Sequence, residues 1–112
     1  MAYEKFAAWK VSHRLALKVY EVTRSCPPSE RYQLTAQIRR AALSAPTNIA
    51  EGAAKRGTRE FRRYLDITLG SLSELSYLLR FSRDSGILVG TPGFLMMKAL
   101  KIWTVFGMRL VF

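Results

Sequence analysis

The stretch from Gln37 to Gly52 constrains the fold of this chain more than any other feature. It reads Gln-Ile-Arg-Arg-Ala-Ala-Leu-Ser-Ala-Pro-Thr-Asn-Ile-Ala-Glu-Gly and combines an arginine pair, many small residues and a closing glycine. Residues that alternate at spacings of four and three lie on one side of a helix. In this stretch and just before it, the residues at these spacings are Leu34, Ile38, Ala41, Ala45 and Asn48. This pattern predicts a helix packed inside a bundle.

The same periodicity predicts four helices, at residues 6–25, 30–53, 59–85 and 94–110. The expected core stripe of the first helix contains Phe6, Trp9, His13, Ala16, Tyr20 and Thr23. That of the third contains Phe61, Leu65, Thr68, Leu72, Leu75 and Leu79. Such seams are typical of antiparallel bundles, so we expect an all-α, up-down four-helix bundle that fills residues 1–112 as one domain.

Signals at the helix ends refine this prediction. Ser29 is a plausible N-cap for the second helix, with Glu30 in its first turn and Gly52 as a left-handed closing residue. Thr58 is the expected cap of the third helix, which Gly86 ends.

Two further features bear on packing. Pro46 lies inside the second helix and must either kink or break it, and we expect a kink. The fourth helix is apolar on more than one side, so its second apolar surface is expected to meet another subunit.

Small and polar residues suggest how the second and third helices meet. Gly70 lacks a side chain opposite the small residues Ala41 and Ala45, which favours a close approach of the two helices. Asn48 is expected to bond Ser71 across this contact, because a buried amide needs a partner. Such a pair would fix the register of the bundle.

The chain has a formal net charge of +10, which suits either a solvated surface or a polyanionic partner. Basic residues gather near the turn between the second and third helices, namely Lys55, Arg56, Arg59, Arg62 and Arg63. Arg39 and Arg40 have two interpretations: a salt bridge, between subunits or within the bundle, to a glutamate such as Glu51 or Glu74, or a contact to phosphate. Base-stacking side chains near the cluster are limited to Phe61 and Tyr64.

Signals for catalysis are missing. The single histidine, His13, falls on the expected core stripe, and the sequence has no phosphate-binding glycine loop, metal-ligand spacing or nucleophile motif. We therefore expect no enzyme activity, no metal and no cofactor. The start lacks a signal-peptide core, lysines and an arginine interrupt the apolar residues 94–112, and Cys26 has no partner, so we expect a cytoplasmic protein that does not enter a membrane.

Several blocks resemble the bacterial family of 23S ribosomal RNA intervening-sequence proteins. They include Tyr3-x-x-Phe6-x-x-Trp9-Lys10, Gln37-Ile38-Arg39-Arg40-Ala41-Ala42, Asn48-Ile49-Ala50-Glu51-Gly52 and Gly70-Ser71-Leu72-x-Glu74-Leu75. The resemblance covers about residues 3–88. Pro46 departs from the family pattern, and so does the apolar, basic segment after Leu88, where members carry an acidic helix.

The resemblance implies a four-helix bundle that assembles into a ring-like homopentamer without established catalytic activity. The family is similar in fold to the accessory variability determinant of diversity-generating retroelements, a basic pentamer that binds nucleic acid and a reverse transcriptase. We therefore expect a basic homo-oligomer that binds RNA or DNA with little sequence specificity. The alternative is a scaffold that docks a reverse transcriptase or another nucleic-acid enzyme.

Overall fold

The computed structural model describes residues 1–30 and 33–87, and these residues contain helices but no strands. Three α-helices make up most of this part: α1 (Ala7–Thr23), α2 (Leu34–Ala53) and α3 (Thr58–Asp84). Short 3-10 helices occupy Ala2–Lys5 and Pro28–Glu30. The expected fourth helix, at 94–110, lies outside the described residues.

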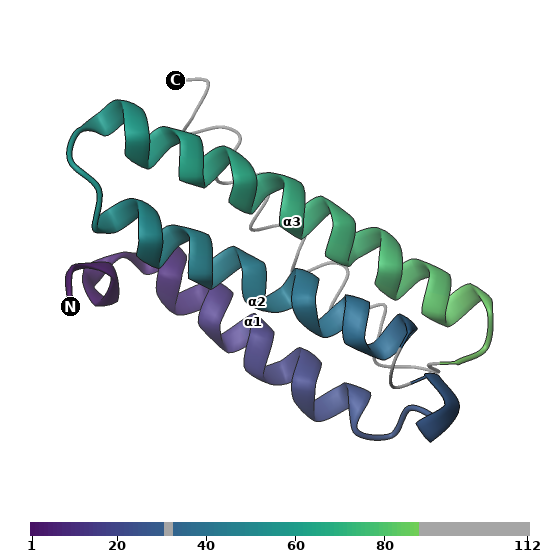
Figure 1. Ribbon diagram of the computed structural model, residues 1–112. Helices are drawn as coiled ribbons and strands as arrows, with labels where there is room; N and C mark the ends of the chain where they lie inside the picture. Colours follow the sequence, from purple (N-terminus) through teal and green to yellow (C-terminus); the bar gives the residue numbers. More distant parts are fainter. Residues whose placement is uncertain (31–32, 88–112) are drawn as a thin grey trace.

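The three helices run up, down and up, with α2 packed against both α1 and α3 (Figure 1). Their facing sides form one hydrophobic core. Its most deeply buried large side chains are Val19, Ile38, Ile49, Leu72, Leu75 and Leu79, each less than 2% exposed. The predicted stripes of α2 and α3 largely match this core, because both keep their apolar residues on one face.

The buried face of α1 matches the predicted one only in part, with Ala16 and Thr23 buried as expected. Leu15 and Val19 lie in the core, whereas His13 is exposed and stacks on the Trp9 ring at 4.8 Å between centroids. Placing His13 on the core stripe was therefore wrong. The spacing of the aromatic residues suggested this stripe. The aliphatic side chains of Leu15 and Val19, each one position before a residue of the stripe, fill the core instead.

The start of α2 was also predicted too early. Ser29 and Glu30 belong to the 3-10 helix, and α2 begins at Leu34 after Gln33, which provides no side-chain cap. Pro27 and Pro28 restrict the backbone before Ser29, and the short 3-10 helix Pro28–Glu30 ends before α2 begins. α2 then continues without a break through the buried Pro46.

Glycines end the helices at positions that only partly match the prediction. Gly86 (φ 81°) closes α3 as expected, and the Ile87 N–H donates to the Ser82 carbonyl at 2.9 Å. Gly52, by contrast, remains within α2 and is not left-handed. The left-handed residue of this turn is Gly57 (φ 89°), and Thr58 is the first residue of α3 and not its cap.

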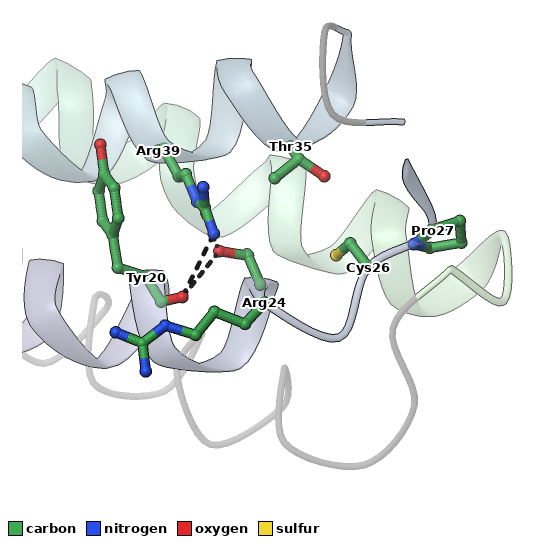
Figure 2. A pocket seen from close by; sticks show the side chains of 7 residues that line it. Tyr20, Arg24, Cys26, Pro27, Thr35 and Arg39 are labelled. Atoms are coloured by element: carbon green, nitrogen blue, oxygen red, sulfur yellow. Dashed lines mark hydrogen bonds between the residues drawn. The ribbon is translucent and has the colours of Figure 1, made fainter. Parts of the chain in front are cut away.

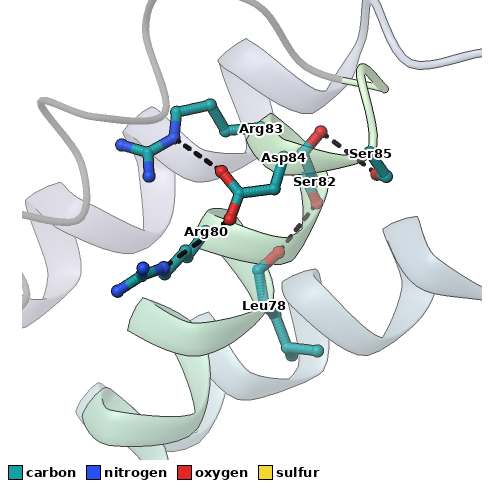
Figure 3. A network of polar contacts seen from close by, with 6 residues as sticks. All are labelled: Leu78, Arg80, Ser82, Arg83, Asp84 and Ser85. Atoms are coloured by element: carbon teal, nitrogen blue, oxygen red, sulfur yellow. Dashed lines mark hydrogen bonds and ion pairs between the residues drawn. The ribbon is translucent and has the colours of Figure 1, made fainter.

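Polar side chains at the end of α3 are paired with one another (Figure 3). Asp84 lies 3.6 Å from Arg80 Nε and 3.2 Å from Arg83 Nε. A carboxylate at a helix C-terminus faces the negative end of the helix dipole, so the two guanidinium groups offset an unfavourable position. Exposed pairs of this kind stabilise the fold by at most about 1 kcal/mol.

A chain of hydrogen bonds joins α2 to α3, but not in the predicted form. Asn48 Nδ2 donates to Ser44 on its own helix, to the carbonyl at 2.8 Å and to Oγ at 3.0 Å. The Ser44 hydroxyl then meets that of Ser71 at 2.7 Å. Ser44 therefore stands between Asn48 and Ser71. Gly70 is exposed with open space around it, so the idea that it allows the close helix approach was wrong.

Candidate nucleic-acid interface

The turn between α2 and α3 carries a dense group of positive charges, which we call the turn cluster. Two members belong to the turn itself and three to the first turns of α3; they are Lys55, Arg56, Arg59, Arg62 and Arg63. All five side chains are exposed. The structure thus brings together the basic residues that the sequence grouped, because the reversal at Gly57 joins the two helix ends.

Most of the turn cluster lacks a carboxylate partner. Among the described residues, no acidic side chain forms an ion pair with Lys55, Arg56, Arg59 or Arg63. The N-terminal end of α3 adds the positive pole of its dipole to the same region. This end of the bundle therefore presents positive charge that is open to an external anion, in contrast to the two arginines paired with Asp84.

Tyr64 forms the floor of part of the cluster. Its half-buried ring lies 5.9 Å from Lys55 Nζ and 5.6 Å from Arg63 Cζ, within the range of cation–π attraction. From the sequence, Tyr64 was one of two side chains near the cluster available to stack on bases. In the structure its ring instead helps to position two cations.

Phe61 is also occupied by contacts within the chain. Its ring centroid is 5.2 Å from that of Phe6, so the segment before α1 packs against the start of α3. Side chains engaged in this way offer little surface for unstacked bases. The site therefore suits contacts to phosphates better than contacts to bases.

Arg39 and Arg40 do not join the turn cluster. They lie in α2 about 20 Å along the helix axis from Gly52, given a rise of about 1.5 Å per residue. Arg40 is exposed, whereas Arg39 is half-buried against α1. Arg39 Nε donates to Thr23 Oγ1 at 2.9 Å and Nη2 to the Tyr20 carbonyl at 3.4 Å (Figure 2).

Within the described part of one subunit, neither Arg39 nor Arg40 forms a salt bridge to Glu51 or Glu74. Glu51 and Glu74 are both exposed, and neither belongs to an ion pair between described residues. Arg39 instead contacts α1, where its guanidinium stacks on Tyr20 at 4.7 Å from the ring centroid. In the described part of the chain, no group of three or more metal-ligating side chains comes together.

One concave feature was not foreseen from the sequence. A pocket of about 280 Å³ lies between the end of α1 and the start of α2, with Tyr20, Arg24, Thr35 and Arg39 in its lining. Thr35 and Arg39 share a helix face at a spacing of four, which hints at the arrangement. The contribution of α1 follows only from the packing of the two helices.

Comparisons with known proteins and a search for membrane-spanning helices give further information about this helical chain. None of the described helices has the length and apolar character needed to cross a membrane. Curated proteins include no significant match to the sequence. The sequence model of the family described as 23S rRNA-intervening sequence protein matches residues 4–94, which include all three described helices and the turn cluster. The chain belongs to the 23S rRNA-intervening sequence protein family.

Proposed function

We propose that this protein is a basic, non-enzymatic homo-oligomer that binds RNA or DNA through phosphate contacts with little sequence specificity. The observation that carries the proposal is the turn cluster, whose exposed cations have few acidic partners. Lysine and arginine gain affinity for nucleic acid by releasing counterions from phosphates, which needs no contact with base edges. The net charge of +10 supports long-range attraction to such a partner.

Self-association would multiply this modest site. The outer face of α3 exposes Ile67, Tyr77 and Phe81, at 43%, 64% and 47%, and apolar side chains of this size favour contact with another protein surface. The resemblance to pentameric proteins and the apolar segment expected at 94–110 support a ring of four-helix subunits. Repeating the cluster around a ring adds weak phosphate contacts through avidity.

Fluorescence anisotropy with single-stranded and duplex RNA tests the proposal. The variant with glutamine at Lys55, Arg56, Arg59, Arg62 and Arg63 is expected to bind more weakly and with a flatter dependence on salt. The slope of log K against log salt is negative, and each lost phosphate contact reduces its magnitude by roughly 0.7 to 0.9. Light scattering on the same samples gives the number of subunits.

A charge-matched control separates the cluster from net charge. Glutamine at Lys10, Arg14, Lys18, Arg80 and Arg83 removes the same formal charge from other surfaces. This control is expected to retain most of the affinity and the salt slope of the unchanged protein. Equal losses in both variants, or an affinity indifferent to salt, would reject the turn cluster as the binding site.

The second candidate is a scaffold that docks a nucleic-acid enzyme such as a reverse transcriptase. The exposed apolar face of α3 favours it, because such a face suits a protein partner as well as another subunit. A pull-down with and without nuclease distinguishes the two functions. An association mediated by RNA disappears after nuclease treatment, whereas a direct contact between proteins persists.

A further inference from the structure

The pocket between α1 and α2 has the features of a second anion site. It encloses about 280 Å³, near the lower limit of about 300 Å³ for small-ligand pockets. It lies at the end of α2 opposite the turn cluster, because α2 runs the length of the bundle between them (Figure 1). A ligand in this pocket is therefore held by residues other than those of the turn cluster.

Arg39 supplies a fixed positive charge to this pocket. Its guanidinium is held by Thr23 Oγ1, by the Tyr20 carbonyl and by the Tyr20 ring. These two hydrogen bonds use Nε and one hydrogen of Nη2, so three of the five guanidinium N–H groups are left for a ligand. No ion pair joins Arg39 to any described carboxylate, so its charge is not neutralised by them.

Thr35 lies in the wall of the same pocket. The residue is only 3% exposed, and its buried Oγ1 has no hydrogen-bond partner. Figure 2 shows Thr35 on α2 between Arg39 and Cys26, with its oxygen on the side away from Arg39. A buried hydroxyl without a partner is unfavourable, and an acceptor atom of a ligand in the pocket would satisfy it.

The surroundings select a negative ligand. Thr35 lies in the first turn of α2, so the positive end of the helix dipole is near this pocket, and the N-cap residue Gln33 makes no side-chain capping hydrogen bond. Arg24 lines the pocket on the α1 side, with its guanidinium extending away from Thr35 (Figure 2), and no carboxylate is among the described lining residues.

We propose that this pocket binds a phosphate group, either as inorganic phosphate or as the terminal phosphate of a nucleotide or RNA. A guanidinium fork matches the oxygens of phosphate, and the Thr35 hydroxyl in the wall of the same pocket is a donor for a further oxygen. The volume exceeds that of a lone phosphate ion and leaves room for an attached sugar.

Isothermal titration calorimetry with sodium phosphate, at ionic strength held constant with sodium chloride, tests the site. Arg39→Gln is expected to weaken phosphate binding by at least roughly tenfold, because it removes charge-assisted hydrogen bonds. Arg40→Gln is the matched control, since it removes the same charge from the neighbouring exposed position, and its affinity is expected to change less than about twofold. Equal losses in the two variants would overturn the proposal.

Thr35→Val is a second test variant, which keeps the site testable if Arg39→Gln misfolds. It removes a hydroxyl that has no partner in the free protein, so it is expected to keep the stability of the fold and to weaken phosphate binding several-fold. An unchanged affinity in this variant would show that the hydroxyl does not bind the ligand, and the proposed site would be wrong.

A comparison of ligand sources completes the experiment. Short RNA with a 5′-phosphate is titrated beside the same RNA with a 5′-hydroxyl, using the turn-cluster glutamine variant to suppress binding elsewhere. Tighter binding of the phosphorylated RNA, lost in Arg39→Gln, would identify a terminal phosphate as the ligand. Equal binding of both RNAs together with binding of inorganic phosphate would identify the free ion. No binding of any phosphate probe overturns the proposal while leaving the function of the turn cluster intact.

Discussion

Gly52 of α2 packs directly against Tyr64 of α3, with no room for a side chain between the two helices at this point. A Cβ atom built on Gly52 would lie 2.7 Å from Tyr64 Cβ and 3.0 Å from Phe61 Cδ2. The Tyr64 atom is at the root of its side chain and cannot swing away, so only a residue without a side chain fits this position. The contact also sets the Tyr64 ring beneath two cations of the turn cluster.

Gly52→Ala is expected to destabilise the fold by about 1–3 kcal/mol, because overpacking outweighs the better helix propensity of alanine. Gly70→Ala is the matched control, since a Cβ there meets nothing within 4 Å. It is expected to stabilise the protein by about 0.5–1 kcal/mol. Urea unfolding followed by circular dichroism measures both, and the same sign for both variants would contradict the assignment.

Ser12→Ala is expected to stabilise the protein by about 1 kcal/mol, because a buried unpaired hydroxyl is unfavourable and alanine is the better helix former. Ser12 is fully buried in α1 and its Oγ has no hydrogen-bond partner. The thermal midpoint should rise by a few degrees. A clear loss of stability would mean that the hydroxyl is bonded in solution.

Thr68→Val is expected to have the opposite effect, although it too removes a fully buried hydroxyl. Thr68 Oγ1 lies 3.2 Å from the Ala45 carbonyl of α2 and 3.1 Å from the Tyr64 carbonyl. Valine leaves at least one of these acceptors without its donor, at a cost of about 1 kcal/mol. Denaturant titrations of Thr68→Val and Ser12→Ala are compared. The free energy of unfolding should fall in Thr68→Val, where the hydroxyl is bonded, and rise in Ser12→Ala, where it is not.

The hydroxyl pair Ser44 and Ser71 is expected to couple α2 to α3. A double-mutant cycle with Ser44→Ala and Ser71→Ala should give an interaction energy of about 0.5–1.5 kcal/mol. Ser73→Ala replaces Ser71→Ala in the control cycle, since Ser73 is exposed on α3. Additive effects in both cycles would show that the 2.7 Å contact contributes nothing.

Gly57→Ala is expected to destabilise the turn that holds the cluster together. Gly57 has φ 89° and ψ 151°, a region that side-chain-bearing residues rarely adopt. The expected cost is about 1–3 kcal/mol, and RNA binding should weaken with it, because the turn would place Lys55 and Arg56 differently. Unfolding curves and anisotropy titrations of one preparation check both effects.

The sequence predicted the stripes of α2 and α3 well because these helices bury aliphatic residues at regular spacing and expose charge opposite. It was only partly right on α1, where Ala16 and Thr23 are buried as predicted but His13 is exposed, and Leu15 and Val19 fill the core instead. The turn cluster was predictable because its members are close in sequence. The pocket was not, since it combines α1 residues such as Tyr20 with Thr35 and Arg39 of α2.

Local sequence alone determined the helical state of residues 7–23, 34–53 and 58–84, the closing role of Gly86 and the concentration of charge near Gly57. These properties depend on periodicity and on backbone preferences that act over a few residues. Only the tertiary structure decided that Gly52 and not Gly70 carries the close approach, that Ser44 stands between Asn48 and Ser71, and that Arg39 binds α1. Each of these depends on which side chain the opposing helix presents, and the spacing of residues along one helix does not encode that.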